Sequence, residues 1–207
     1  MFDVKLRQKI DPVLTKIVKN TFLIRLNPTS ITIFGFFIGI LGCSALYAGN
    51  YSLALALLFV NRICDGLDGI IAREKRPTLL GGYLDIVLDF LFYSGYVFAF
   101  GLGHPTQAVF SSFLIFSFVG TGSSFLTFAI MEQKLTSRRA PMNKSFHYLG
   151  GLTEGTETIA ALALFTIFPE YFPLIAIVFG AMCWITVVTR IIQANVTLSA
   201  EDNAKLD

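Results

Sequence analysis

Long apolar stretches constrain the fold of this chain more than any other feature. Hydrophobic residues make up 54% of its 207 residues and charged residues only 14%, with a mean hydropathy of +0.66. A helix of about 20 apolar residues crosses the roughly 30 Å of hydrocarbon in a bilayer. Six segments reach that length. They predict an all-α, polytopic membrane protein with six transmembrane helices near residues 30–48, 52–73, 80–102, 108–131, 149–168 and 171–192.

The residues before the first span have the pattern of an amphipathic helix. Apolar residues recur at helical spacing over residues 2–22, with lysines and arginines between them. Such a helix lies on an anionic leaflet, although its outer half is equally compatible with a solvated leader. We therefore expect one domain over residues 1–207, with an interfacial helix at 1–24, a six-helix bundle at 30–192 and a loose polar tail at 196–207.

Positive charge is distributed unevenly among the connections. Lysines and arginines lie before the first span, between the second and third spans, between the fourth and fifth spans, and in the tail, whereas the other three connections carry none. In a six-helix arrangement, 14 of the 16 positive residues therefore fall on one side. The positive-inside rule then predicts that both termini and the aspartate motif described next face the cytoplasm. The 14 residues are Lys5, Arg7, Lys9, Lys16, Lys19, Arg25, Arg73, Lys75, Arg76, Lys134, Arg138, Arg139, Lys144 and Lys205.

Four aspartates interrupt the apolar sequence at helical spacing. The first pair lies in Asp65-x-x-Asp68-Gly69-x-x-Ala72-Arg73, and the second in Gly81-x-x-x-Asp85-x-x-x-Asp89. Residues three or four apart share one face of a helix, so each pair forms one acidic face. A carboxylate inside a bilayer is costly, rare and usually functional. The alternative is a structural role in helix packing, which explains one or two buried aspartates more readily than four.

Two helices that turn these faces toward each other form a cage of hard oxygen ligands. Magnesium, manganese or calcium suits such a cage better than zinc or iron, which favour sulfur and imidazole. The cysteines, Cys43, Cys64 and Cys183, are scattered in apolar runs and are expected to be small core residues. Arg62, one turn before Asp65, either neutralises a motif carboxylate or extends to the membrane interface.

The aspartate motif resembles the signature of the CDP-alcohol phosphotransferases, integral membrane enzymes of phospholipid synthesis. The resemblance includes residues 27–32, Asn-Pro-Thr-Ser-Ile-Thr, and more loosely all six helices. One departure is the spacer from Arg73 to Gly81, which has seven residues where the family usually has eight. Residues 120–125 and 144–158 also resemble a subgroup of bacterial inner-membrane members, which places the chain in that membrane without naming its acceptor.

This resemblance implies an activity and a set of site residues. A CDP-diacylglycerol-like donor passes its lipid phosphate to an acceptor alcohol and CMP leaves. Two Mg²⁺ or Mn²⁺ ions assist by neutralising charge on the phosphate oxygens. Asp89 is also implied to be the base that takes the proton of the acceptor hydroxyl. A homodimer is implied, and no nucleic-acid partner is expected. The implied metal ligands are Asp65, Asp68, Asp85 and Asp89, and the implied donor-binding residues are Gly69, Ala72, Arg73 and Gly81.

A second polar cluster offers a candidate acceptor pocket. Glu154 and Glu157 lie near the start of the fifth predicted helix, where acidic residues also favour the helix dipole and Thr153 or Ser145 could serve as the cap. If these glutamates line a pocket, the acceptor head is neutral or amine-bearing. Three basic residues argue instead for a phosphate, namely Arg138, Arg139 and Lys144.

Two other functions fit part of the pattern. A membrane prenyltransferase also uses aspartates and magnesium around a pyrophosphate, but its acidic pairs lie far apart in sequence. A divalent-cation transporter needs polar residues along a path to the far side, whereas the outer halves of these helices are mostly Phe, Leu, Ile and Ala. The motif favours the transferase over both.

Overall fold

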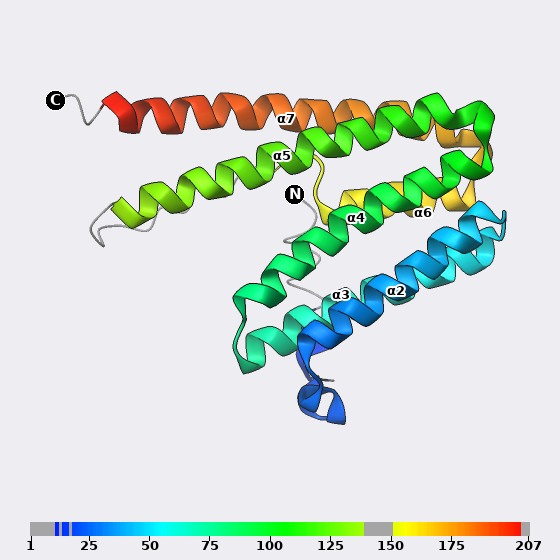
Figure 1. Cartoon of the computed structure of the whole chain (residues 1–207), viewed down its shortest axis with the longest axis horizontal. Coiled ribbons are helices and arrows are strands. Elements are labelled where there is room, and N and C mark those ends of the chain that lie inside the picture. The colour runs from blue at the N-terminus through cyan, green and yellow to red at the C-terminus, as the bar shows by residue number, and fades with distance from the viewer. Residues whose placement is uncertain (1–10, 13, 17, 139–150, 204–207) are drawn as a thin grey trace.

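Six long helices make up most of the computed structural model, which describes residues 11–12, 14–16, 18–138 and 151–203 (Figure 1). No strand occurs among these residues, so the all-α prediction is confirmed. Three short 3₁₀ turns join them: η1 (Phe22–Arg25), η2 (Pro105–Gln107) and η3 (Pro169–Tyr171). The long helices are α2 (Pro28–Tyr47), α3 (Tyr51–Lys75), α4 (Leu79–Gly103), α5 (Ala108–Arg138), α6 (Gly155–Ile167) and α7 (Phe172–Asn203).

The first helices begin where a polar side chain accepts a free backbone N–H. The Asn27 side chain accepts from the Thr29 N–H at 3.0 Å, and Pro28 occupies the first helical position. The Thr78 hydroxyl accepts from the Gly81 N–H at 3.0 Å and starts α4. After α2, Gly49 has a φ of +75°, which a glycine adopts without strain, so the turn into α3 is short.

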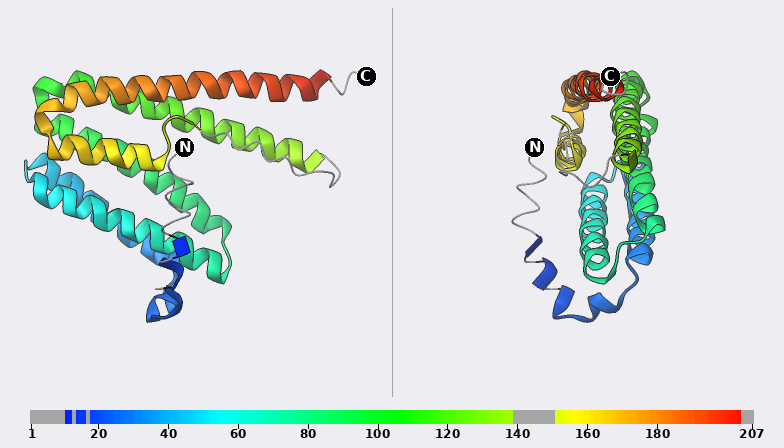
Figure 2. Two further views of the ribbon diagram at one scale, coloured as in Figure 1. Left: turned by 180° about the vertical axis from the view of Figure 1, so that it is seen from behind. Right: turned by 90° about the vertical axis from the view of Figure 1, so that its left-hand side faces the viewer.

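The helices alternate in direction and fall into two groups, one of α2, α3 and α4 and the other of α5 and α7, with α6 between them. The α2–α3, α4–α5 and α6–α7 connections gather at one end, and the α3–α4 connection and the C-terminal end of α7 lie toward the other (Figure 1). Helix α2 packs against α3 and α4, α5 packs against α7, and α6 contacts α3, α4 and α7. The two groups diverge away from the α2–α3 connection (Figure 2). The aspartate helices α3 and α4 therefore belong to the same group.

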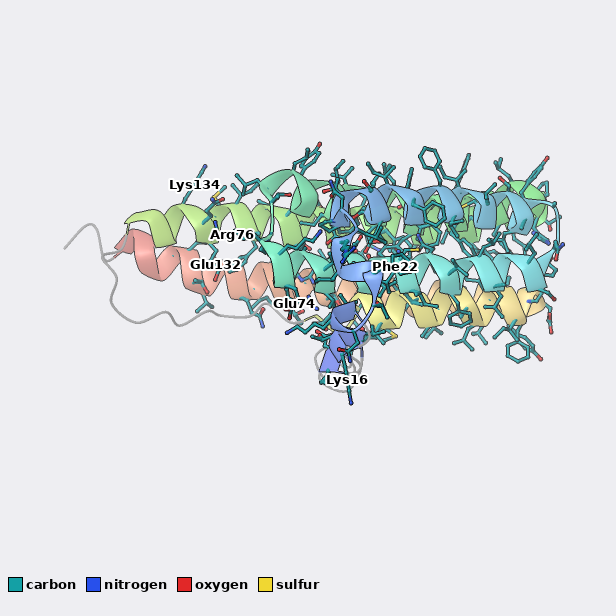
Figure 3. The ribbon with its side chains drawn as sticks, turned by 90° about the horizontal axis from the view of Figure 1, so that it is seen from below. Lys16, Phe22, Glu74, Arg76, Glu132 and Lys134 are labelled. Atoms are coloured by element: carbon teal, nitrogen blue, oxygen red, sulfur yellow. The ribbon has the colours of Figure 1, made fainter. Side chains whose placement is uncertain are left out.

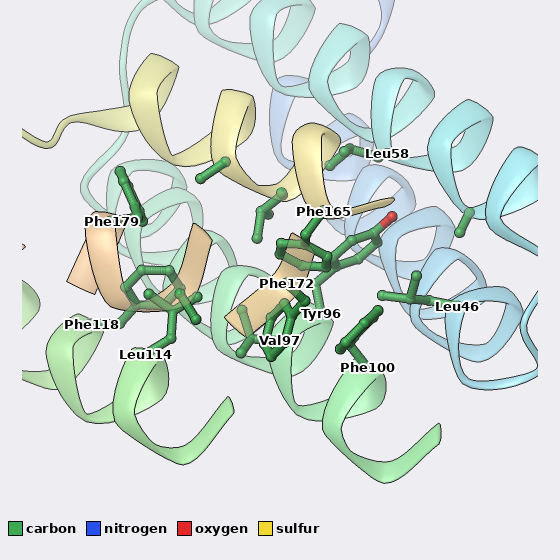
Figure 4. Packing of buried hydrophobic residues seen from close by; sticks show 14 of the residues in the cluster. Leu46, Leu58, Tyr96, Val97, Phe100, Leu114, Phe118, Phe165, Phe172 and Phe179 are labelled. Carbon is green, nitrogen blue, oxygen red and sulfur yellow. The ribbon is translucent and has the colours of Figure 1, made fainter. Parts of the chain in front are cut away.

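An aromatic core joins the two groups. Tyr96, Phe100, Phe165 and Phe172 are fully buried and come from α4, α6 and α7 (Figure 4). Their rings pack edge-on or tilted, with centroids 4.2 to 5.9 Å apart, and the Tyr96 hydroxyl shares a 3.0 Å hydrogen bond with that of Thr166. This core fixes α4 in the centre of the bundle, with α2 and α3 on one side of it.

A glycine stripe lets α2 approach its neighbours closely. A Cβ atom at Gly35 would lie 2.8 Å from the Cβ atom of Cys64, and one at Gly39 would lie 2.6 Å from the Phe92 ring. Both glycines are buried, as expected for a small-residue packing face. Cys64 is a free, buried core residue, in line with the expectation for the cysteines.

Four of the described helical segments are long and apolar enough to cross a membrane: Pro28–Tyr47, Leu79–Gly103, Pro105–Lys134 and Pro169–Ser199. The chain is thus a membrane protein, but two of the six predicted spans do not meet this criterion. Helix α3 carries Arg62 and two aspartates, which lower its hydropathy. Helix α6 has 13 residues, so it extends only about 20 Å.

The ends of the last two helices differ from the sequence-based boundaries. The fifth span was expected over 149–168, but α6 begins at Gly155, because residues 151–154 form a capped turn. The tail expected to be loose over 196–207 is helical as far as Asn203. No glycine or proline lies between residues 196 and 203. The backbone of α7 therefore continues past its apolar stretch.

The N-terminal segment packs against α3. Its described residues between 11 and 19 have helical backbone, and Val18 is fully buried against Ile70 and Ile71. An ion pair of 2.9 Å joins Lys19 to Glu74. Arg76, Glu132 and Lys134 lie toward the end of the bundle away from the α2–α3 connection, and Lys16 projects outward near its middle (Figure 3).

Candidate active site

The four motif aspartates converge on one narrow pocket between α2, α3 and α4. We call it the acid pocket. It has a volume of about 10 Å³, which is room for about one water molecule. Helical spacing places Asp65 and Asp68 on one face of α3 and Asp85 and Asp89 on one face of α4, and these faces meet here. The pocket is lined by Thr32, Gly35, Phe36, Asn61, Arg62, Asp65, Asp68, Asp85, Leu88 and Asp89.

The aspartates differ in their exposure to solvent. Asp68 is 4% exposed, and the Thr32 hydroxyl of α2 donates a hydrogen bond to its carboxylate. The side chains of Asp65 and Asp89 are 31% and 28% exposed, and Asp85 is exposed. The pocket is therefore closed at Asp68 and open at Asp85.

Arg62 neutralises motif carboxylates, which resolves the choice left open by the sequence. Its guanidinium donates to both oxygens of Asp89, with N–O distances of 2.8 and 3.4 Å, and lies 3.5 Å from an oxygen of Asp65. Such a two-pronged contact is the strongest form of a charge-assisted hydrogen bond. Only 14% of the Arg62 side chain is exposed, so it does not extend to the membrane interface.

A polar network holds Arg62 in place. Its Nε donates to the Asn61 side chain at 2.7 Å, and Asn61 in turn donates to the Gly35 carbonyl of α2 at 2.8 Å. The Tyr93 hydroxyl accepts from Arg62 at 2.8 Å and donates to Asp89 at 2.9 Å. Backbone and side chains from three helices thus set the orientation of Asp89.

A second, larger pocket adjoins the acid pocket. We call it the motif pocket; its volume is about 210 Å³. The two pockets share Thr32, Asp68 and Asp85 as a common wall. Four of the other lining residues, Gly69, Ala72, Arg73 and Gly81, are those that the resemblance assigned to donor binding. The rest are Pro28, Thr29, Pro77, Thr78 and Gly82.

Arg73 lies at the exposed edge of the motif pocket. Half of its side chain is exposed, and its guanidinium forms a 3.0 Å ion pair with Asp11 of the N-terminal segment. Two residues later, Lys75 donates to the Leu26 carbonyl at 2.8 Å and ties the end of α3 to η1. The N-terminal segment therefore contacts the one motif side chain whose charge suits a phosphate.

The donor atoms of the acid pocket suit a hard divalent cation. Carboxylate and hydroxyl oxygens are the ligands that magnesium and manganese prefer. In the part of the chain that the structure describes, no three acidic, histidine or cysteine side chains are close enough together to hold an ion. The guanidinium of Arg62 contacts both Asp65 and Asp89. The residues of the acid pocket fit such an ion in the chemistry of their donor atoms.

The glutamates of the candidate acceptor pocket have a structural role. Glu154 is the N-cap of α6, and its carboxylate accepts from the Gly151 N–H at 3.2 Å. Glu157 accepts from the Glu154 N–H at 3.1 Å and completes a capping box. Thr153, expected as a cap, instead donates its hydroxyl to that of Thr186. Neither glutamate lines the acid pocket or the motif pocket.

The three basic residues of that candidate pocket are not placed. Arg138 ends α5, but its side chain lies outside the described residues, as do Arg139 and Lys144.

Three residues of the acid pocket region were missed by the sequence analysis as site residues. Thr32 had a signal, because it ends the stretch 27–32 that is part of the family resemblance, whereas Asn61 is an ordinary polar residue near an apolar run and nothing in its spacing distinguishes it. Tyr93 had a signal, because it lies four residues after Asp89 and continues the row that begins at Gly81 by one further helical turn.

Comparisons with known proteins agree with this geometry. The chain is 44% identical over 202 residues to inner membrane protein YnjF of Escherichia coli, covering 97% of this chain and 98% of that protein. It is 28% identical over 193 residues to an archaetidylinositol phosphate synthase of Pyrococcus horikoshii, covering 92% and 95%. Its fold is similar to the crystal structure of Mycobacterium tuberculosis phosphatidylinositol phosphate synthase (PgsA1) with CDP-DAG bound. That match has a TM-score of 0.64 and 17% identity, and covers 89% and 94% of the two chains.

The sequence profile of CDP-alcohol phosphatidyltransferases matches residues 25–192, a range that contains both aspartate pairs and all lining residues of the two pockets. The resemblance inferred from the motif is confirmed, and the chain belongs to the CDP-alcohol phosphatidyltransferase family.

Proposed function

We propose that this chain transfers a phosphatidyl-type group from a CDP-linked lipid, such as CDP-diacylglycerol, to an acceptor alcohol and releases CMP. The observation that carries the proposal is the common wall of the two pockets, since Thr32, Asp68 and Asp85 line both. A donor in the motif pocket would have its phosphates beside the acid pocket. Membership of the family supports this activity, within phospholipid biosynthesis.

The motif pocket is our candidate site for the CDP portion of the donor. Gly69, Ala72 and Gly81 present little side chain to it, so a nucleotide can lie against the backbone of α3 and α4. Arg73 stands at the exposed edge, where its planar fork of N–H donors suits a phosphate. The structure of the mycobacterial enzyme with CDP-DAG bound supports a donor of this class.

Asp65, Asp68, Asp85 and Asp89 are our candidates to hold two Mg²⁺ or Mn²⁺ ions. Bound there, such ions neutralise the charge that builds on phosphate oxygens during displacement. The all-oxygen chemistry of the acid pocket supports this assignment.

Asp89 is our candidate for the general base. Its carboxylate takes the proton of the acceptor hydroxyl, and the freed oxygen bonds to the phosphorus that carries the lipid. The bond from that phosphorus to the bridging oxygen breaks, and CMP leaves with the electron pair. A base must come within hydrogen-bond reach of the hydroxyl, and the partial exposure of Asp89 to the pocket supports this role.

Two classes of acceptor alcohol are candidates, one with a neutral or amine-bearing head and one that carries a phosphate. The capping box accounts for Glu154 and Glu157 without a ligand, which weakens the argument for a neutral or amine-bearing acceptor. Arg138, Arg139 and Lys144 remain candidates to bind a phosphate on the acceptor. The names of the archaeal relative and of the mycobacterial enzyme both include an inositol phosphate, so that compound belongs in any test panel.

We further propose a six-span bundle in a bacterial inner membrane, in which the short α6 completes its span with residues 151–154, and both termini and the acid pocket face the cytoplasm. The alternation of the connections and the uneven distribution of lysine and arginine in the sequence support this arrangement. The E. coli relative, named an inner membrane protein, supports the location. The N-terminal helix would lie on the cytoplasmic leaflet, and two copies would form a homodimer.

An exchange assay tests the proposal. Purified protein in lipid is incubated with CDP-diacylglycerol, Mg²⁺ and a panel of alcohols that includes inositol phosphate, and CMP release is measured. We expect release that depends on one alcohol and is lost in Asp89→Asn. Absence of CDP-diacylglycerol binding would contradict the proposal. Prenyl pyrophosphate binding or metal flux would then favour the prenyltransferase or the transporter, both of which the family match disfavours.

A further inference from the structure

Arg62 is a nearly buried cation surrounded by acids. Its guanidinium reaches both oxygens of Asp89, at 2.8 and 3.4 Å, and one oxygen of Asp65, at 3.5 Å. With 14% of the side chain exposed, solvent screens these contacts weakly. Removing one partner of such a pair leaves the other charge uncompensated in a dry environment. The position of Arg62 therefore bears directly on the state of Asp89.

Contacts from three helices hold the Arg62 guanidinium in one position. Asn61 receives its Nε–H at 2.7 Å and is itself fixed by a 2.8 Å hydrogen bond to the Gly35 carbonyl. Tyr93 accepts a third hydrogen bond at 2.8 Å. The cation also stacks over the rings of Phe92 and Tyr93, each 5.2 Å from the guanidinium carbon. An arginine that only extended along the helix toward water would not require this many partners.

These contacts occupy the carboxylate of Asp89. One oxygen accepts from Arg62 alone, and the other accepts from both Arg62 and the Tyr93 hydroxyl, at 2.9 Å for the latter. In the proposed function, a divalent cation would use an oxygen of this same carboxylate as a ligand. The remaining space in the acid pocket is about 10 Å³, which is near the minimum for a single water molecule. The guanidinium and a divalent cation thus draw on the same oxygens and the same space.

We propose that Arg62 is a positioning residue that acts as the internal counter-cation of the acid pocket and competes with divalent cations for Asp89. The inference rests on the proposed function, in which Asp89 is both a cation ligand and the base. Arg62 holds Asp89 in the orientation that the acceptor meets. If Asp89 held a divalent cation, one of its oxygens would no longer accept from the guanidinium, and the Tyr93 hydroxyl would still donate to the same carboxylate.

Mn²⁺ binding tests the competition directly. The full chain in nanodiscs is titrated with Mn²⁺ alone, and free Mn²⁺ is followed by electron paramagnetic resonance. In Arg62→Gln, Mn²⁺ should bind at least about tenfold more tightly, because a unit positive charge beside the dication has been removed. Arg62→Lys keeps the charge but loses the fork and should give an intermediate affinity. Arg190→Gln is the matched control, since Arg190 is also buried in a helix but lines neither pocket, and it should leave Mn²⁺ affinity within about twofold.

Kinetics and stability provide readouts that separate positioning from simple packing. In Arg62→Gln, kcat for CMP release should fall by more than about tenfold, because Asp89 loses its orientation, while KM for the CDP donor changes little. Thermal stability in EDTA should fall, because the aspartates then repel one another, and Mn²⁺ should restore more of it than in the wild type. A residue that served packing alone would lose stability equally with and without Mn²⁺.

One result would contradict only the competition between Arg62 and divalent cations, and a different result would contradict the proposed cation site as well. Mn²⁺ binding that is unchanged or weaker in both Arg62→Gln and Arg62→Lys, while the wild-type affinity depends on Asp65, overturns the competition alone. Mn²⁺ binding that survives Asp65→Asn and Asp68→Asn overturns the cation site of the proposed function, and with it this inference. If Arg62→Gln does not fold, the Arg62→Lys titration decides, because a lysine affinity equal to the wild type overturns the role of the fork.

Discussion

The Thr32 hydroxyl of α2 donates a hydrogen bond to the Asp68 carboxylate of α3, and this contact fixes the wall between the two pockets. Asp68 is 4% exposed, so few water molecules can replace that donor. This contact ties α2 to the first aspartate pair, because Asp68 lies 36 residues after Thr32 in the chain.

Thr32→Val keeps the shape of the side chain and removes the donor. Leaving a buried acceptor without its partner costs about 1 to 3 kcal/mol, so we expect a lower thermal unfolding temperature in detergent and a lower kcat. Thr189→Val is the control, because the Thr189 hydroxyl bonds only to the Thr186 carbonyl of its own helix. Equal effects of the two substitutions would show that the Asp68 contact has no special weight.

The ion pair between Asp11 and Arg73 predicts a competition at the edge of the motif pocket. If Arg73 binds a donor phosphate, Asp11 must release it first. An exposed ion pair is worth up to about 1 kcal/mol, so Asp11→Asn should tighten binding of CDP-diacylglycerol by about two- to fivefold. Equilibrium binding of a labelled CDP-lipid measures this.

Lys19→Gln is the matched control for Asp11→Asn. Lys19 lies on the same N-terminal segment as Asp11, and its substitution breaks the ion pair with Glu74 of α3 without changing the contact to Arg73. Donor affinity should therefore not change. Weaker donor binding in Asp11→Asn would mean that Asp11 orients Arg73 for the donor instead of competing with it.

The close approach of α2 and α3 predicts a steep penalty at Gly35. An added methyl group would lie 2.8 Å from the Cβ atom of Cys64, which is attached to rigid backbone, so Gly35→Ala should destabilise the protein by about 1 to 3 kcal/mol. Gly82→Ala serves as the comparison, since a Cβ there meets no atom within 4 Å and alanine favours a helix. Thermal unfolding of both variants should shift in opposite directions, and a neutral Gly35→Ala would show that the helices can separate at little cost.

The capping box of α6 predicts different results for two changes at Glu157. Glutamine can still accept from the Glu154 N–H, so Glu157→Gln should alter stability little, whereas Glu157→Ala should cost about 0.5 to 2 kcal/mol. Thermal unfolding is the measurement. A large rise in KM for the acceptor in Glu157→Gln, with unchanged stability, would instead restore the role in acceptor binding that the sequence suggested.

Much of the fold and of the site geometry could be predicted from the sequence, because both depend on periodicity. The apolar stretches predicted the positions of α2, α3 and α4 and the start of α5 closely, since a bilayer and a helix repeat impose their lengths, but α5 continues past the predicted end at 131 to Arg138. The spacing of the aspartates placed each pair on one helical face, and those faces meet. The helical continuation of α7 to Asn203 was not predicted, because a polar helix end has no periodic signal.

The contacts that depend on side-chain choice could not be predicted. The position of Arg62 before Asp65 allowed either an ion pair or an extension to the interface, and only the packing of α2, α3 and α4 decides between them. The contact between Asp11 and Arg73 joins residues 62 positions apart and leaves no local pattern. The capping role of Glu154 was hidden because serine, threonine, aspartate and asparagine are the usual caps, and Thr153 is the nearer match.

The wall that the two pockets share has a thermodynamic consequence. Asp68 and Asp85 face both the space proposed for cations and the space proposed for the CDP donor, so neither occupant can bind without altering the electrostatic field that the other meets. Linkage then requires reciprocity, because any factor by which the cations raise donor affinity must equal the factor by which the donor raises cation affinity. Free CMP, which lacks the lipid phosphate, should return only part of that factor, so cations would be held most tightly before transfer and more loosely after it.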